Sequence, residues 1–558
     1  MKKKTIAMLL AVSMCLTSLA GCGGDGKKAE KKDQGEFINT FTGSWPESLD
    51  PSTKSDLYGT DILYNITEPL LRIQDMKDGE EGAIEVVEAG AESYEISDDE
   101  KVYTLHLRDN KWTDGEPVTA EDYVYGMQRS ISQEAACPNA NFLYYIVNGE
   151  AINTGKKKPE ELGVKALDDK TIEITLEHPT PFFLQLLTQR PFLPQRKDLY
   201  EKYGDTYGTD PEKTPQCGPF VIDEWVINSK QEFKKNPDYW DAENIKLDNI
   251  HVKVLQDSNT IYNSLAKGEI DFCAVADPKR RKEFENNKDF IMTEVRRADT
   301  GYLLVNCKDS SNLKNAKMRQ AVSIAIDRQE VIDATEHGVP IPGYDFVPPV
   351  MHVSGCEETF NKEGEGWVKK LMDENPDPRK LFIEGLKEAG LDPDPGKFTL
   401  RYLGAGNSPE GRQMTECIAG QIQDVLGVKV DAQDKEWNAF MNDVQADEYD
   451  VANLALNAGY DDPSDFLSAY YSKAPNFDTG YANADYDKYY EESQCEPDLE
   501  KRSQLLHDAE KLIVYDDAVA IPLQHRISYR FTAKYVKDAN ISMFCTTGWR
   551  NMSTADRK

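Results

Sequence analysis

The sequence predicts an α/β fold, because segments with the spacing of strands alternate with segments that have the spacing of helices. Residues 102–107 (VYTLHL) alternate apolar and polar side chains, as a strand with one buried face does. Thr119, followed by Glu121 and Asp122, precedes an apolar stretch with helical spacing, which is typical of a helix start. The chain has 558 residues, more than one hydrophobic core usually serves, so two or three domains are expected. Together these observations favour an α/β architecture with several domains.

The N-terminus predicts an export signal and a lipid anchor. Lysines at 2–4 precede a mostly apolar run over 5–20, and small residues lead into Cys22. The run is too short to span a bilayer, which takes about 20 apolar residues. Residues 19–22 (LAGC) resemble a bacterial lipobox; the alternative is an ordinary secretory signal with a chance cysteine. The resemblance implies that residues 1–21 are a signal peptide and that Cys22, carrying diacylglycerol, anchors the protein to the outer face of the cell membrane.

Residues 22–36 predict a flexible tether, because they are polar, rich in Gly and Lys, and unable to bury a core. The formal net charge of the chain is −33, and removing residues 1–21, with three lysines and no acidic residue, leaves −36. Nucleic acid demands a basic surface, so this acidity argues against nucleic-acid binding. It also keeps the body away from an anionic membrane surface, which leaves the lipid as the expected membrane contact.

The alternation of strands and helices continues along the globular part. Residues 171–176 (TIEITL) alternate again after an Asp-Asp-Lys turn at 168–170, which predicts a second strand. Helical spacing returns at 318–326, with Asn315 as its expected cap.

No motif for catalysis or metal binding is found in the sequence. The seven histidines lack HExxH spacing, and GxSxG, GxxxxGK[ST] and GxGxxG are absent. Adjacent acids such as Asp461 and Asp462 are interpreted as solvated surface charge, because 98 acidic residues make such pairs common. The eight cysteines beyond Cys22 are far apart without a CxxC pair, so zinc is not expected, while disulfides and free thiols both remain open. We expect a binding protein with no cofactor, no metal and no enzymatic activity.

Several blocks, in the same order over residues 37–547, resemble the signature of family 5 bacterial extracellular solute-binding proteins. They are residues 91–108, 112–124 (WTDGEPVTAEDYV), 217–220 (CGPF), 236–240 (NPDYW), 268–271 (GEID) and 315–333. Within this family the chain is most similar to the oligopeptide-binding proteins of ABC importers.

The resemblance implies a two-lobed periplasmic-binding-protein-like fold of type II with an inserted third subdomain. Lobe I would combine residues 37–75, 205–300 and 520–558. The inserted subdomain would be residues 76–204, and lobe II would be residues 301–519. Two chain crossings between the lobes would act as a hinge, and a ligand in the cleft would close the lobes around itself.

The resemblance also implies a ligand site within residues 436–463. In peptide-binding relatives this region adds the peptide as a β-strand, and the aspartate of an A-D-Y-x-[DE]-P pattern pairs with the free amino group of the peptide. Here residues 458–463 read AGYDDP, with Gly459 in place of that aspartate. Positions that carry arginine for the peptide carboxylate fall on Val444 and Asn453, and a usual tryptophan falls on Leu456. The ligand-binding residues expected from the resemblance are Tyr145, Trp437, Asn453, Leu456, Asn457, Gly459 and Asp461.

Gly459 has an energetic consequence, because a buried ammonium without a counter-charge is heavily penalised. Either Asp461 or another acid replaces the missing aspartate, or the ligand has no free amine there. Asp461 could equally be a turn residue that caps the segment at Pro463. Trp437 could belong to the core rather than to the cleft wall, and Tyr145 aligns only loosely with a cleft tyrosine.

The leading hypothesis is a lipid-anchored, monomeric receptor that captures an oligopeptide or peptide-like ligand for an ABC importer. Its expected partners are permease and ATPase subunits, besides the membrane through Cys22. A first alternative is a binding protein for a non-peptide solute such as an oligosaccharide, an opine-like compound or a metal chelate. A second is a receptor that senses its ligand without transport, and a third is an extracellular hydrolase.

Overall fold

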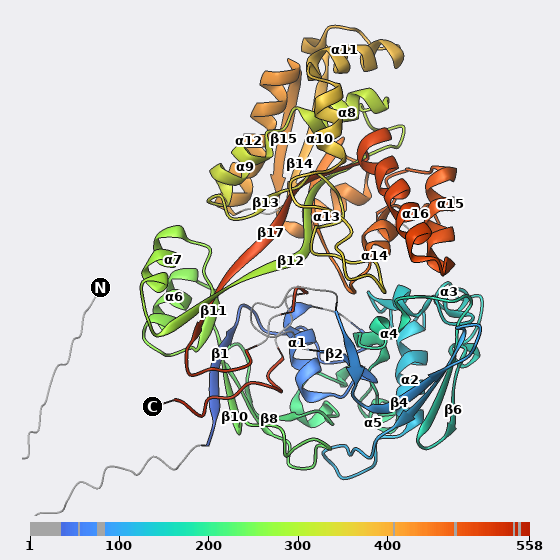
Figure 1. Ribbon diagram of the computed structural model, residues 1–558, viewed down its shortest axis with the longest axis vertical. Coiled ribbons are helices and arrows are strands. Elements are labelled where there is room, and N and C mark those ends of the chain that lie inside the picture. The colour runs from blue at the N-terminus through green and yellow to red at the C-terminus, as the bar shows by residue number, and fades with distance from the viewer. Residues whose placement is uncertain are drawn as a thin grey trace, which may run out of the picture.

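The computed structural model describes residues 35–53, 56–74, 84–405, 408–473, 477–539, 542–544 and 548–557. The expected signal peptide, Cys22 and the tether up to residue 34 lie outside these residues, so the lipid anchor stays a prediction. Helices and strands are mixed along the described chain, which confirms the predicted α/β class. An upper body, whose core comes from residues 298–523, stands over a lower body formed by the described residues before 298 and after 523 (Figure 1).

One four-stranded sheet of the lower body begins the described chain. β1 (Phe37–Thr42) lies parallel to β10 (Asn249–Val254), and the sheet continues with β9 (Lys230–Lys235) and β8 (Phe220–Val226). α1 (Leu57–Ile66) shares one hydrophobic core with these strands. This packing places α1 below the junction with the upper body (Figure 1).

A second four-stranded sheet of the lower body has the order β4 (Ala91–Ile96), β5 (Val102–Leu107), β7 (Thr171–Thr175) and β6 (Val164–Asp168). β5 and β7 confirm the two strands predicted from alternation, and both bury alternate residues. α2 (Ala120–Ile131) begins directly after the threonine expected at its start, and a capping box satisfies the first backbone amides. The aliphatic and aromatic residues of this sheet and α2 form a core of their own.

The other helices and strands of the lower body are short. They are β2 (Leu71–Ile73), β3 (Val86–Glu88), β11 (Phe272–Ala274), α3 (Gly149–Asn153), α4 (Phe183–Leu186), α5 (Lys197–Tyr203), α6 (Ser258–Ala266) and α7 (Pro278–Glu285).

The upper body is built on a sheet that β11 also joins. Its strand order is β11, β17 (Ala520–Ala533), β12 (Phe290–Val305), β16 (Val451–Asn457), β14 (Thr399–Ala405) and β15 (Lys429–Lys435), with β13 (Ile341–Pro342) paired to β17. The helices around it are α8 (Ala316–Ile324), α9 (Arg328–Thr335), α10 (Trp367–Glu374), α11 (Pro378–Glu388), α12 (Pro409–Leu426), α13 (Trp437–Gln445), α14 (Pro463–Leu467), α15 (Ala484–Cys495) and α16 (Leu499–Lys511).

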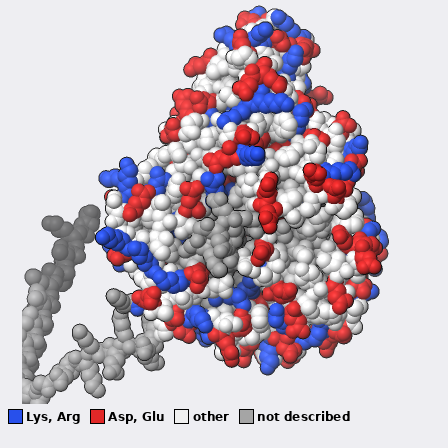
Figure 2. Space-filling model, in the orientation of Figure 1, with Lys and Arg blue, Asp and Glu red and all other residues white. Residues whose placement is uncertain are grey.

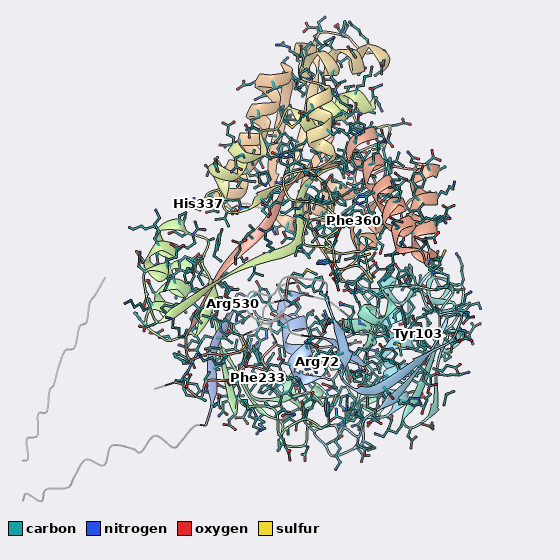
Figure 3. All side chains as sticks on the ribbon, viewed as in Figure 1. Arg72, Tyr103, Phe233, His337, Phe360 and Arg530 are labelled. Carbon is teal, nitrogen blue, oxygen red and sulfur yellow. The ribbon has the colours of Figure 1, made fainter. Side chains whose placement is uncertain are left out.

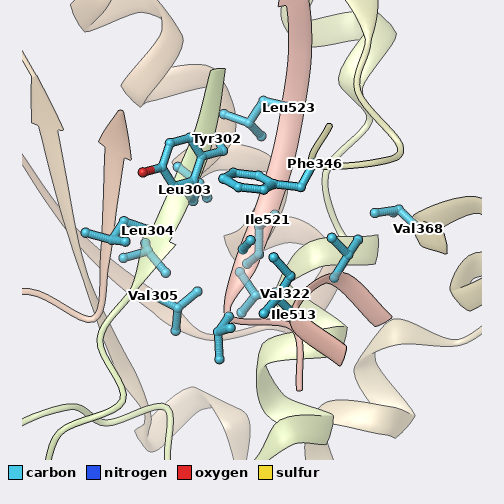
Figure 4. Packing of buried hydrophobic residues seen from close by; sticks show 14 of the residues in the cluster. Tyr302, Leu303, Leu304, Val305, Val322, Phe346, Val368, Ile513, Ile521 and Leu523 are labelled. Atoms are coloured by element: carbon cyan, nitrogen blue, oxygen red, sulfur yellow. The ribbon is translucent and has the colours of Figure 1, made fainter. Parts of the chain in front are cut away.

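The core of the upper body forms where β12 and β17 meet α8. Tyr302 and Ile521 from the two strands pack with Val322 of α8, and the ring of Phe346 lies across Tyr302 (Figure 4). α8 begins after Asn315, whose side chain accepts a hydrogen bond from a backbone amide of the first turn, as the sequence predicted.

Two long strands connect the bodies. β12 and β17 pair antiparallel from the Phe290–Ala533 end to the Leu304–Ala520 end, and they cross from the lower to the upper body (Figure 1). Phe531 of β17 lies in a core of the lower body, whereas Ile521 of the same strand lies in the core of the upper body. The pairing shifts register between Arg296 and Thr300, which marks a β-bulge near the junction.

The adjacent acids Asp461 and Asp462 are buried, so their interpretation as solvated surface charge was wrong. Both carboxylate oxygens of Asp462 accept hydrogen bonds from the Arg502 guanidinium, at 2.8 and 2.9 Å. Burial alone would raise the pKa of Asp462, but the positive charge of Arg502 and the hydrogen bonds from Arg502, Ser354 and Ser464 together outweigh it and hold that pKa below its usual range. Asp462 also caps α14 by accepting from the Ser464 amide, so the ion pair fixes the chain that enters this helix.

Replacing Arg502 by methionine should lower the free energy of unfolding by about 3–5 kcal/mol, because Asp462 would stay buried without its partner. Urea denaturation followed by circular dichroism measures this change. Lys397→Met, which breaks an ion pair of two half-exposed side chains with Asp392, is the matched control and should change little. Equal changes in the free energy of unfolding for the two substitutions would show that the buried ion pair does not stabilise this region.

Candidate functional site

A cavity of about 770 Å³ lies at the junction of the two bodies. From below it is lined by α1, by residues 138–142 and, near the C-terminus, by Ser542, Phe544, Gly548 and Arg550. From above it is lined by the end of β16 and the start of α14, and Arg297 and Arg526 reach it from the two crossing strands. Cavities of roughly 300–1,000 Å³ are typical of sites that enclose a small ligand.

Three of the residues expected at the site line this cavity. Leu456 and Asn457 are the last two residues of β16, and Gly459 lies two residues beyond the end of the strand. Leu456 is paired with Thr300 of β12, so these residues lie beside the bulge in the crossing strand. The end of β16 is therefore the part of the predicted site that the structure brings to the cavity.

Two expected residues lie elsewhere on the upper body. Trp437 begins α13 with 52% of its surface exposed, and it stacks on Phe440 with ring centroids 5.6 Å apart. The amide of Asn453 contacts the sulfur of Met414 at 3.2 Å. Neither residue lines the cavity, and the ligand-binding roles given to them by resemblance stay predictions.

Tyr145 and Asp461 lie at the contact between the two bodies rather than in the cavity. Tyr145 packs against Phe182 and lies within 3.5 Å of the Gln494 amide oxygen. The Asp461 carboxylate accepts from the backbone and the ring of His352, at 2.8 and 2.9 Å. The Asp461 carboxylate is therefore buried and already hydrogen-bonded to another residue of the protein.

The residues around Gly459 form a tight aromatic contact between the bodies. The ring of the buried Tyr460 stacks on Phe182 at 4.7 Å, and its edge meets Phe142 at 5.9 Å. A Cβ atom at Gly459 would lie 2.6 Å from the tip of the Phe142 ring. Glycine is therefore the residue that lets the end of β16 approach the lower body this closely.

Asp465 is an acid at the cavity that the sequence analysis missed. It lies at the third position of α14, where a side chain turns back toward the residues before the helix, and it accepts a hydrogen bond from the Gly459 amide at 2.6 Å. Burial raises the pKa of Asp465 to about 7. An acid three residues after the helix cap Asp462 was the signal that could have found it.

Four of the residues that line the cavity are arginines, which the sequence analysis also missed. Arg72, on β2 in the lower body (Figure 3), pairs with Glu68 at 2.7 Å, and Arg550 pairs with Asp241. Arg297 of β12 and Arg526 of β17 both lie within the register shift. Four arginines and two acids, Asp56 and Asp465, give the cavity its charged wall.

Within the described ranges, no three histidine, cysteine or acidic side chains are arranged to hold a metal ion. Seven cysteines are free thiols, and Cys545 lies outside the described residues. None of the described helices combines the length and the apolar character that crossing a membrane requires.

Residues 85–478 match the family described as bacterial extracellular solute-binding proteins, family 5 Middle. The chain is 29% identical over 562 residues to the oligopeptide-binding protein OppA of Bacillus subtilis, which covers 97% of this chain and 96% of that protein. It is 30% identical over 532 residues to the dipeptide-binding protein DppE of the same organism, with 93% of each chain covered.

A solved structure, OppA of Listeria monocytogenes bound to peptide, matches with a TM-score of 0.76 at 29% identity and covers 93% of this chain and 99% of that chain. This match confirms the two-lobed solute-binding fold that the resemblance implied. From the family match and the identity to DppE over nearly its whole length, the chain belongs to the family 5 bacterial extracellular solute-binding proteins.

Proposed function

We propose that this protein is an extracytoplasmic receptor that encloses oligopeptides in the cavity between its two bodies and delivers them to an ABC importer. The observation that carries this proposal is the cavity of about 770 Å³, which is lined from both bodies in a chain similar to oligopeptide- and dipeptide-binding proteins. The lower body would comprise lobe I and the inserted subdomain, over the ranges expected from the resemblance. Lobe II would be the upper body.

Binding would work by closure of the two bodies. A ligand that touches Leu456 above and α1 below gains contacts only when the bodies are together, and only this difference can favour the closed form. β12 and β17 would bend as the hinge, because both strands run from one body to the other.

Asp465 would take the part of the aspartate that Gly459 replaces. Its carboxylate faces the cavity and is bonded to the Gly459 amide, so a peptide ammonium near Gly459 would find a counter-charge. Asp461 would not serve, because its carboxylate is already bonded to His352. Asp461 would then be a structural residue beneath the loop rather than a ligand contact.

The remaining parts of the proposal concern location and partners. Cys22 would carry the lipid that holds the protein at the outer face of the cell membrane, where it would act as a monomer beside permease and ATPase subunits. Capture would involve no cofactor, no metal and no chemical conversion of the ligand.

A blocked peptide or a non-peptide solute is the second candidate. It is favoured by the pKa of Asp465, since a carboxyl group that titrates near 7 can donate a hydrogen bond as well as pair with an ammonium. A receptor that senses its ligand without transport would use the same cavity.

Mass spectrometry of the molecules that co-purify with the protein tests the peptide proposal directly. Peptides should be found, and resynthesised peptides should raise the melting temperature, with a stabilisation of about 2.7 kcal/mol at a ligand concentration of ~100 Kd. Stabilisation by sugars or chelates alone, in a panel that includes free and N-acetylated peptides, would refute peptide binding.

Affinity for peptides with a free amino group should rise with pH, because an ammonium needs the ionised form of Asp465. With a pKa of about 7 in the free protein, affinity should be about 15-fold weaker at pH 5.5 than at pH 7. Isothermal titration calorimetry measures this, and Asp465→Asn should bind weakly with a flat pH profile. Asp56→Asn, at another acid of the cavity wall, is the control and should keep the slope. A slope that survives in Asp465→Asn would assign the ammonium to another group.

A methyl group at Gly459 should weaken binding by opposing closure. It would press against Phe142 in the closed form, and an overpacking cost of about 1.4 kcal/mol corresponds to tenfold lower affinity. Phe142→Leu should restore much of the affinity in the double variant Gly459→Ala/Phe142→Leu. Gly420→Ala on α12, where a Cβ atom meets nothing within 4 Å, should bind like the wild type. Unchanged affinity of Gly459→Ala would mean that this contact does not govern closure.

A further inference from the structure

We infer that Arg297 and Arg526 form an anion-binding subsite that takes a carboxylate of the bound ligand. This inference deepens the proposed function and depends on it for the nature of the ligand. Both side chains line the cavity, and both come from the strands that connect the two bodies.

The β-bulge brings the two arginines together. Arg296 pairs with Ile527 and Thr300 pairs with His525, so three residues of β12 face the single residue Arg526 of β17. A bulge of this kind re-aims side chains, and it is often found next to binding sites. Arg297 is the first of these three residues, and it therefore lies at the cavity beside Arg526.

The two guanidinium groups share one carboxylate. Asp299, which is 1% exposed, lies 2.9 Å from Arg297 and 3.7 Å from Arg526. The backbone amide of Arg526 also donates to Asp299 at 3.2 Å. Two positive charges against one negative charge leave a surplus of one positive charge at this point of the cavity wall.

The other two arginines of the cavity carry no surplus of positive charge. Arg72 and Arg550 each pair with a carboxylate of their own, Glu68 and Asp241. The Nε atoms of Arg297 and Arg550 are buried without a hydrogen-bond partner among the described residues. Of these two arginines, only Arg297 shares its carboxylate with a second arginine. The unmatched charge and an unused donor therefore coincide at Arg297 and Arg526.

A carboxylate is the anion that fits this pair. Arginine presents its N–H groups in a planar fork that matches a carboxylate, and such charge-assisted bonds strengthen where water is excluded. The chain as a whole carries −33, and acidic and basic side chains are interspersed over the face in Figure 2. An anionic group of the ligand would thus be attracted by this local surplus rather than by the net charge of the protein. The carboxylate could be the C-terminus of a peptide or the side chain of an acidic residue.

The test compares capture of a tryptic casein digest with capture of the same digest after methyl esterification, which removes the carboxylates and keeps the amines. The wild-type protein should retain the native peptides at least tenfold better, measured by mass spectrometry of the bound fraction. Arg526→Gln and Arg297→Gln should lose most of this preference, while Arg526→Lys should keep part of it. Arg296→Gln is the matched control, because Arg296 is the neighbour on β12, carries the same charge and does not line the cavity.

Equal capture of native and esterified peptides by the wild type, or an unchanged preference in Arg526→Gln, would overturn the inference. Captured peptides resynthesised as C-terminal amides, or with Glu replaced by Gln, would show which carboxylate is bound. Capture of no peptide at all would refute the proposed function. In that case succinate tests the subsite without a peptide. At constant ionic strength, succinate should raise the melting temperature of the wild type but not that of Arg526→Gln. Equal shifts of the two melting temperatures would reject the subsite.

Discussion

The buried ion pair between Arg502 and Asp462 is the interaction on which the site depends. It fixes the segment between β16 and α14, whose start supplies Gly459 to the cavity and Tyr460 to the contact with the lower body. The first turn of α14 then places Asp465 behind Gly459. One desolvated pair thereby positions a backbone amide, an aromatic anchor and a titrating acid with respect to one another.

The elements of the fold with local signals were predictable from sequence. Alternating residues gave the strands at 102–107 and 171–176, and Thr119 and Asn315 marked helix starts. These signals depend on neighbours in the chain, so tertiary contacts are not needed to interpret them. The order of the family blocks identified the fold and the family as a whole.

The details of the site depend on contacts between distant residues, and so sequence reasoning reached them only in part. Asp462 looked like surface charge because its partner Arg502 is 40 residues away. Gly459 was found at the cavity, but the ring of Phe142 that demands a glycine there is in the other body. Arg297 reaches the cavity through a shift in strand register, which no spacing rule foresees.

The β-bulge at Arg297 has a mechanical consequence. β12 and β17 are adjacent in one sheet, so the bodies cannot swing independently of the ladder that joins these strands. The register of this ladder shifts between Arg296 and Thr300 and again between Gly301 and Tyr302, and bending at these shifts strains the fewest interstrand hydrogen bonds. The first of these two shifts, which contains Arg297, is thus also part of the cavity wall. A ligand bound there would stiffen the point at which the strands bend. The lifetime of the closed conformation would then depend on how tightly that one end of the ligand is bound.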